Sequence, residues 1–305
     1  MKRLIPYIFL LLFSIFIFYN RDSIYKIYKT YVIETESKKI TSPTKNSYYR
    51  NYDFRYIQNV EDFIPDNKQE LLNVIYSVIN SGVSEYTFYC PVDYKDCIKD
   101  VEEIASNQVL LSDINNYVHP FNSFEHIETE YDDLNKVTLS LKKNYTDNEI
   151  KEVENKVNDI YNKLYNPNTT DYNNIKAFHD YIINNTKYDS NRSEYNIIDY
   201  RSDIAYGTFI DHYALCGGYS DAMALFLEKM GIKNFKVASS NHVWNAVYLN
   251  DNWYNLDLTW DDPVTPDNRD ILDHSYFLVS TDKLLSLDTT EHTFESNFYK
   301  ELKNS

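Results

Sequence analysis

The chain reads Cys216-Gly-Gly-Tyr-Ser-Asp-Ala-Met-Ala-Leu-Phe-Leu-Glu-Lys-Met230 in its C-terminal half, and this stretch decides the fold. Its large side chains recur at helical spacing and share one face: Tyr219, Met223, Phe226, Leu227 and Met230. Gly231 follows, as is typical of the residue at which a helix stops. The pattern predicts a packed helix whose first residue is Cys216.

A hairpin is predicted downstream of this helix. Its strands cover residues 242–249 and 253–260, and the connection Asn250-Asp-Asn252 suits the positive φ values of a tight turn. Side chains alternate between the two faces of a strand, so His242 shares a face with Trp244. Asp257 shares a face with Trp253. A helix start and two adjacent antiparallel strands therefore bring one cysteine, one histidine and one aspartate together.

These three residues suit nucleophilic catalysis. A cysteine reacts as the thiolate, which is favoured by the partial positive charge of a helix N-terminus and by a neighbouring imidazolium. His242 can protonate a leaving amine and later deprotonate an incoming acceptor. Asp257 can orient the imidazole and support its charge. We therefore predict that Cys216, His242 and Asp257 form a catalytic triad, with the Cys216 backbone N–H as one donor to an oxyanion.

Other residues near the triad are given secondary roles. His212 is a rival base because it lies close to Cys216 in sequence, but only Asp211 beside it offers a carboxylate. Three further aromatic residues are expected near the cleft, although a tryptophan more often packs in a core: Trp244, Trp253 and Tyr219. His179 is expected on a helix surface, and His274 and His292 in later loops. Asp261-Asp262-Pro263 is interpreted as a turn that ends a strand rather than as a cation site.

Three blocks of this sequence resemble the transglutaminase-like superfamily. They are Leu215-Cys216-Gly-Gly-Tyr-Ser-Asp-Ala, His242-Val-Trp-Asn245 and Trp253-Tyr-Asn-Leu-Asp257-Leu-Thr-Trp-Asp-Asp-Pro263. The resemblance covers roughly residues 171–292 and fills all three catalytic positions. Val243 stands where alanine is common, and this departure removes no reacting atom.

The resemblance implies a fold and a range of activities. The expected fold class is α+β, with a papain-like core in which the helix bearing the cysteine packs against an antiparallel sheet. Members of the superfamily include protein cross-linkers, cysteine peptidases, amidases and inactive scaffolds, so the fold does not define the substrate. We expect thiol-dependent acyl transfer or amide hydrolysis on a protein or peptide. The alternative is an inactive envelope-binding module of the same fold.

The N-terminus predicts a membrane anchor. An apolar run occupies residues 4–19 after Met1-Lys2-Arg3, and no small-residue cleavage site follows it. As a helix this run is roughly 24 Å long, short for a bilayer, but Arg21 can snorkel to extend it. Basic residues flank both sides, so topology is nearly balanced. We expect a single-pass protein of the cell membrane with its catalytic domain outside the cytoplasm.

The remaining chain divides into four expected segments. These are a signal anchor at 1–29, a Tyr-rich stalk at 30–60, a small α/β N-terminal domain at 61–165 and the catalytic domain at 166–305. In the third segment, helical periodicity begins at Asp66 and ends at Gly82, and Thr146-Asp-Asn-Glu149 has the spacing of a capping box.

Composition limits the partners. The 305 residues carry a formal net charge of −16, which argues against a nucleic-acid or anionic-lipid surface. The sequence holds no CxxC or HExxH spacing, so neither a metal nor another cofactor is expected. Cys90 and Cys97 can form a small-loop disulfide outside the cytoplasm, or remain two thiols in a reducing compartment. Nothing in the sequence indicates an oligomeric state.

Overall fold

The computed structural model describes residues 5–264 and 271–304. Its helices are α1 (Ile5–Ser37), α2 (Lys68–Ser81), α3 (Cys97–Ser106), α4 (Gln108–Asn115), α5 (Asp147–Leu164), α6 (Asp171–Asn185), α7 (Ser190–Tyr195), α8 (Cys216–Lys229) and α9 (Thr281–Leu287), with short helices η1 (Pro120–Asn122), η2 (Gly207–Asp211) and η3 (Lys300–Asn304). Its strands are β1 (Glu85–Tyr89), β2 (Phe124–Tyr131), β3 (Lys136–Lys143), β4 (Lys187–Tyr188), β5 (Tyr213–Ala214), β6 (Asn234–Ala238), β7 (Val243–Leu249) and β8 (Asn252–Leu256).

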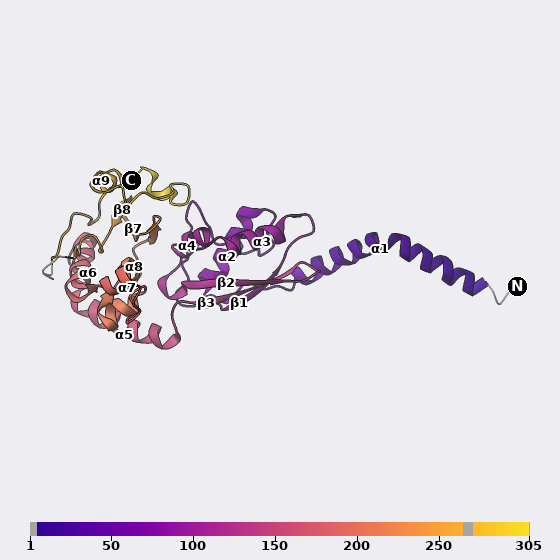
Figure 1. Ribbon diagram of the computed structural model, residues 1–305, viewed down its shortest axis with the longest axis horizontal. Helices are drawn as coiled ribbons and strands as arrows, with labels where there is room; N and C mark the ends of the chain where they lie inside the picture. The colour runs from indigo at the N-terminus through magenta and orange to yellow at the C-terminus, as the bar shows by residue number, and fades with distance from the viewer. Residues whose placement is uncertain (1–4, 265–270, 305) are drawn as a thin grey trace.

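Helix α1 projects away from the folded body, as Figure 1 shows. It is long and apolar enough to cross a membrane, and none of its most apolar window is buried. The helix continues to Ser37, well past the apolar run at residues 4–19. A possible single-pass anchor is thus present, and its orientation in a membrane stays a prediction.

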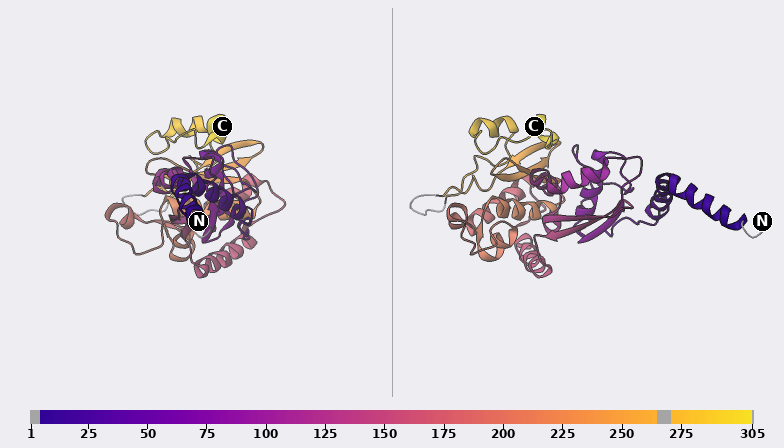
Figure 2. Two further views of the ribbon diagram at one scale, coloured as in Figure 1. Left: turned by 90° about the vertical axis from the view of Figure 1, so that its right-hand side faces the viewer. Right: turned by 45° about the vertical axis from the view of Figure 1, so that its right-hand side comes forward.

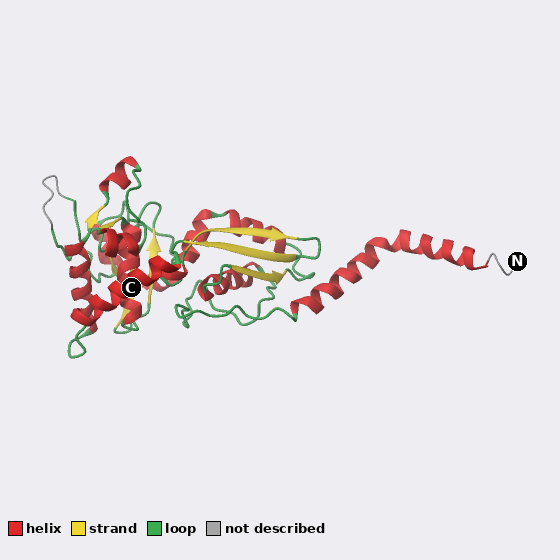
Figure 3. Cartoon of the chain, turned by 90° about the horizontal axis from the view of Figure 1, so that it is seen from below, coloured by secondary structure: helices red, strands yellow, loops and turns green. Residues whose placement is uncertain are grey.

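The next layer is a three-stranded antiparallel sheet in the order β1-β3-β2, seen side by side in Figure 3. Val137, Leu139 and Leu141 alternate along β3 and face the core, where α2 packs. The predicted features of the flanking helices are present: Gly82 ends α2 at a φ of 78°, and Thr146 and Glu149 form the capping box of α5.

Residues 38–67 form no helix or strand, yet part of this segment is buried. Phe54 and Ile57 belong to the same core as α2, and the buried Arg50 pairs with Glu228 of α8 at 2.8 Å. The segment expected as a stalk therefore packs against the folded body, because its aromatic and aliphatic side chains find apolar partners. The four-segment division itself stays a prediction.

A second antiparallel sheet, β6-β7-β8, lies between two apolar cores. Trp244 and Ala246 face the core that includes α2, whereas Val247 and Leu249 face the core that includes α6 and α8. Figure 2 shows this sheet and the surrounding helices at the end of the molecule remote from α1. A helix bearing Cys216 therefore packs on an antiparallel sheet, which confirms the predicted α+β class.

Candidate active site

Cys216 is the first residue of α8. Leu215 precedes it in an extended conformation, and its apolar side chain cannot accept a hydrogen bond from the helix N-terminus. The cysteine is a free thiol and is partly exposed. The Ser220 hydroxyl donates to the carbonyl oxygens of Cys216 at 2.7 Å and of Val243 at 3.1 Å, which ties the helix to β7. The thiol thus lies at a helix N-terminus whose position is fixed against β7.

The two glycines after Cys216 allow another segment to approach the helix. A Cβ atom at Gly217 would lie 2.5 Å from the Asp203 carbonyl oxygen, and one at Gly218 would lie 2.4 Å from that of Ser202. The Leu215 N–H also donates to the Ser202 oxygen at 2.8 Å. The Cys-Gly-Gly sequence is therefore required by close backbone packing, which fixes the position of the thiol.

His242 and Asp257 lie at neighbouring ends of β7 and β8. His242 Nε2 is 2.6 Å from Asp257 Oδ2, and both side chains are buried. Asp257 was expected inside the second strand, but β8 ends at Leu256. The reason is local: Asp257 Oδ1 accepts the N–H groups of Thr259 at 2.9 Å and Trp260 at 3.2 Å, which turns the chain.

The imidazole of His242 also lies near Cys216. Cys216 is one of the groups that raise the pKa of His242, and Asp257 occupies Nε2, so Nδ1 is the ring nitrogen left for the thiol. Burial lowers the pKa of His242, but the charge and hydrogen bond of Asp257, assisted by Cys216, outweigh burial and raise this pKa to about 10. The geometry therefore favours an imidazolium beside Cys216.

Asp257 is correspondingly held as a carboxylate. Burial raises its pKa, but His242 and then His292 counteract burial and lower the pKa to about 2. Its two oxygens together receive four contacts, two from backbone N–H groups and two from imidazoles. A buried carboxylate with this many donors remains ionised and keeps a fixed orientation.

His292 is the site residue that the sequence did not reveal. It is fully buried, with Nε2 2.9 Å from Asp257 Oδ2 and Nδ1 2.9 Å from Asp288 Oδ2. Its ring packs against Trp244 at a centroid distance of 5.0 Å and Trp260 at 5.2 Å. The short segment around it carries no recognisable motif. A weak signal existed in the four-residue spacing of Asp288 and His292, which does not indicate a distant partner.

The three aromatic residues predicted near the cleft occupy different environments. Trp244 is buried beneath His242, with ring centroids 5.7 Å apart, and donates to Asn255 Oδ1 at 2.9 Å. Tyr219 is buried and donates to Asp262 at 2.5 Å. The ring of Trp253 packs against that of Phe235, with the ring centroids 4.8 Å apart. Trp244 thus packs directly against His242, whereas the half-buried Trp253 pairs with Tyr248 at the turn end of the hairpin, away from His242.

The remaining sequence alternatives are also placed. His212 Nδ1 lies 3.0 Å from the Asn185 carbonyl oxygen, which engages this rival base away from the triad. His179 is not on a helix surface: it is fully buried on α6, because its ring bonds two carboxylates and packs against Phe277. Asp261 is buried and contacts His179, just as Asp257, four residues earlier, contacts His242.

Two groups of described residues bring enough ligand atoms together for a metal ion. They are His242 with Asp257 and His292, and His179 with Asp180 and His274. In the first group each imidazole directs Nε2 to the same carboxylate oxygen, and two N–H donors satisfy this arrangement without a metal. In the second group, His274 Nε2 contacts both a carboxylate oxygen and the Lys176 ammonium.

Comparisons with known proteins match part of this chain to one family and to solved structures. Residues 158–258 match the family described as the transglutaminase-like superfamily. A solved transglutaminase structure aligns with 45% of this chain and 44% of its own, at 17% identity and a TM-score of 0.34. A candidate cysteine protease from Cytophaga hutchinsonii aligns with 48% of this chain and 65% of its own, at 13% identity and a TM-score of 0.28. The chain thus spans less than two thirds of either structure. No curated protein matches the sequence.

Proposed function

We propose that this chain is a thiol-dependent acyltransferase or amide hydrolase acting on proteins or peptides, because its residues 158–258 match the transglutaminase-like superfamily. The observation that carries the proposal is the position of His242, which lies 2.6 Å from the Asp257 carboxylate and close enough to Cys216 for that residue to raise its pKa. A nucleophile, a base and an orienting group in this order are what acyl transfer requires.

In the proposed reaction, the Cys216 thiolate attacks the carbonyl carbon of an amide. The Cys216 backbone N–H at the start of α8 donates a hydrogen bond to the carbonyl oxygen and stabilises the negative charge that develops there. His242 then gives its proton to the leaving nitrogen, and the C–N bond breaks to leave a thioester and an amine or ammonia. Asp257 holds the ring in position throughout.

The thioester is resolved by a second nucleophile. An amine or a water molecule attacks its carbonyl carbon while neutral His242 removes a proton, and the C–S bond breaks to restore the thiolate and imidazolium pair. An amine gives transfer and water gives hydrolysis. The apolar rings of Trp244 and Trp260 surround the histidines, and a dry site of this kind limits attack by water.

We place this activity at the cell envelope. The support comes from α1, which is apolar enough to anchor the chain, and from the bond between Cys90 and Cys97, which persists in oxidising compartments. The catalytic domain is accordingly assigned outside the cytoplasm. The net charge of −16 favours a neutral or basic substrate over an acidic one.

The competing function is an inactive module that uses this fold only for binding. A binding module has no need of a thiol, an imidazole and a carboxylate in contact. It predicts that loss of the Cys216 sulfur leaves every activity of the protein unchanged.

To test the proposal, the detergent-solubilised full chain is incubated with a mixture of unfolded proteins and a biotin-labelled primary amine. Intact-mass analysis then measures the masses of the proteins in the mixture. We expect either amine incorporation, which identifies transfer, or new cleavage products, which identify hydrolysis. Cys216→Ala should abolish both, and His212→Ala should abolish neither because His212 lies outside the triad. Absence of both products with the wild-type chain, or their persistence in Cys216→Ala, contradicts the proposal.

A further inference from the structure

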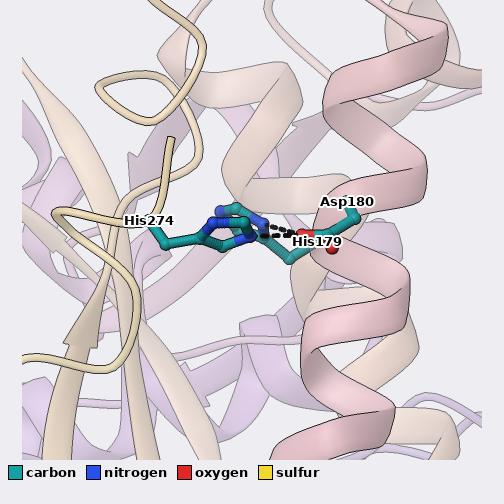
Figure 4. A group of neighbouring side chains, drawn as sticks. All are labelled: His179, Asp180 and His274. Atoms are coloured by element: carbon teal, nitrogen blue, oxygen red, sulfur yellow. Dashed lines mark hydrogen bonds and ion pairs between the residues drawn. The ribbon is translucent and has the colours of Figure 1, made fainter. Parts of the chain in front are cut away.

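A second group of histidine and carboxylate side chains lies apart from the triad. His179 and Asp180 are consecutive residues of α6, and His274 comes from the segment between β8 and α9. Figure 4 shows the two imidazole rings and the carboxylate pointing toward one another. His179 is fully buried, whereas the side chains of Asp180 and His274 are 27% and 34% exposed, so the group has one side open to solvent.

One oxygen of Asp180 is the centre of the group. Asp180 Oδ1 lies 2.9 Å from His179 Nδ1 and 2.7 Å from His274 Nε2. The ligand atoms of all three residues lie within 4.8 Å of one another. Lys176, one turn earlier on α6, places Nζ 2.6 Å from Asp180 Oδ2 and 2.9 Å from His274 Nε2.

Hydrogen bonds alone do not satisfy His274 Nε2. If this nitrogen carries a proton, it can donate to Asp180 but opposes the Lys176 ammonium. If it carries a lone pair, it can accept from Lys176 but opposes the Asp180 oxygen. Either way one close contact is unfavourable, which is unusual for a partly buried group. A cation other than the lysine ammonium, placed between the ring nitrogens and the carboxylate, resolves the conflict.

Asp261 provides the outer support that a metal-binding histidine needs. Its Oδ2 lies 3.1 Å from His179 Nε2, and both side chains are buried. A proton on Nε2 donated to this carboxylate leaves the lone pair on Nδ1, which faces Asp180 Oδ1. Carboxylates commonly fix the tautomer and orientation of metal-binding histidines in this manner.

We propose that His179 Nδ1, Asp180 Oδ1 and His274 Nε2 bind a divalent transition-metal ion, with zinc as the representative case. Imidazole and carboxylate ligands suit this class of ion, and zinc–ligand bonds of about 2.0–2.2 Å place neighbouring ligand atoms roughly 3.3 Å apart. The separations of 2.7 and 2.9 Å between Asp180 Oδ1 and the two ring nitrogens are therefore within roughly half an ångström of this spacing. Lys176, whose side chain is 38% exposed, moves outward as the ion enters.

The ion would have a structural role near the triad. It would join α6 to the segment that carries Tyr276, whose backbone oxygen accepts the Asp257 N–H at 3.2 Å. The Tyr276 N–H in turn donates to Asp261 Oδ1 at 2.9 Å. No metal was expected from the sequence because no CxxC or HExxH spacing occurs, whereas these ligands come from α6 and from a segment 94 residues later.

The test measures zinc binding in a chain that cannot bind zinc through its catalytic thiol. The full chain carrying Cys216→Ala, expressed without a histidine tag, is solubilised in detergent, stripped with a chelator and titrated with zinc chloride by calorimetry. Metal retained after desalting is measured by elemental mass spectrometry. We expect a single zinc ion per chain, and cobalt in its place should give visible absorption bands of a low-coordinate site.

Two variants and one control make the assignment specific. His274→Ala should lose stoichiometric binding, whereas His126→Ala should retain it, because His126 is similarly exposed and lies beside a carboxylate outside the group. Lys176→Met should bind zinc on the order of tenfold more tightly, because a competing ammonium is removed. This gain keeps the test decisive even if His274→Ala folds poorly.

The proposal is overturned if the stripped chain binds no stoichiometric zinc, or if His274→Ala and His126→Ala bind equally. It is also overturned if Lys176→Met binds no more tightly than the parent, since the group would then be a hydrogen-bonded cluster only. Because every measurement is made without the Cys216 sulfur, these results are independent of the proposed acyl-transfer activity.

Discussion

His292 Nε2 lies 2.9 Å from Asp257 Oδ2, the same oxygen that contacts His242, although His292 follows Asp257 by 35 residues in the chain. The carboxylate is thus held from two sides, by the hairpin that carries His242 and by the segment after α9. Asp288 holds the other ring nitrogen of His292 at 2.9 Å. The orientation of Asp257 therefore depends also on His292, whose ring meets that of His242 edge-on with centroids 5.3 Å apart.

We predict that His292 is a positioning residue. His292→Leu removes one donor from a buried carboxylate, a loss worth about 1–3 kcal/mol, so the rate of Cys216 acylation should fall about tenfold or more. His292→Gln retains an N–H donor and should recover part of the rate. The rate is measured as kcat/KM at several pH values, because altered support of Asp257 should also move the pH profile. Equal rates and profiles in His292→Leu and wild type would remove His292 from the account.

The ion pair of His242 and Asp257 predicts a pH-dependent contribution to stability. The pKa of His242 is raised from 6.5 to about 10, so its contribution is fully present below pH 6.5 and is lost as pH rises through about 10. The pKa of Asp257 is lowered from 3.8 to about 2, so its contribution is present above pH 3.8 and is lost as pH falls through about 2.

The difference in unfolding free energy between wild type and Asp257→Asn should therefore be larger at pH 5–6 than at pH 9. Urea unfolding at each pH measures this difference, and the paired comparison cancels the titration of the many other groups. A difference that stays constant, or that grows toward pH 9, would show that the pair is not ionised as described.

Gly217 is predicted to be essential to the position of the thiol. Gly217→Ala places a Cβ atom 2.5 Å from the Asp203 oxygen, and relieving this clash should cost about 1–3 kcal/mol and displace the start of α8. Gly231→Ala is the matched control: its Cβ meets no atom within 4 Å, but its φ of 74° carries a strain of about 1–2 kcal/mol. Both variants should lose stability, and only Gly217→Ala should slow alkylation of Cys216. Equal alkylation rates in the two variants would refute the packing argument.

The disulfide is predicted to stabilise the N-terminal layer. Cys90 and Cys97 are seven residues apart, and closing so short a loop contributes roughly 2–3 kcal/mol by the chain-entropy relation. Replacing both cysteines by serine should lower the midpoint of thermal unfolding by several degrees. Reductant should lower the midpoint of the wild type similarly and leave that of the double variant unchanged. A reductant effect of the same size in both proteins would argue against this bond.

Much of the local structure could be predicted because its signals are short in range. Asn250 and Asp251 adopt the positive φ values predicted for the hairpin, 50° and 63°. Gly231 ends its helix at a φ of 74°, again as predicted. These features depend on the backbone angles that each residue type allows, so the local sequence is enough to predict them.

The errors and omissions concern contacts between distant residues. His179 was expected on a surface, but it is buried. Asp261, 82 residues away in sequence, provides the hydrogen-bond partner that a buried imidazole needs. His292 was expected in a loop, and its partner Asp257 cannot be inferred from local pattern. Asp257 itself lies beyond β8 because its side chain accepts hydrogen bonds from the following turn. Such side-chain hydrogen bonds compete with strand pairing, and the periodicity of apolar residues cannot predict them.

The central claim is that His242 activates the Cys216 thiol, and alkylation by iodoacetamide at near-neutral pH measures this most directly. In the full chain without reductant, we expect Cys216 to be alkylated rapidly, while Cys90 and Cys97 are protected by their bond. His242→Ala should slow the reaction at Cys216 strongly, and His212→Ala should not. Slow alkylation of Cys216 in the wild type, unchanged by His242→Ala, would contradict the account.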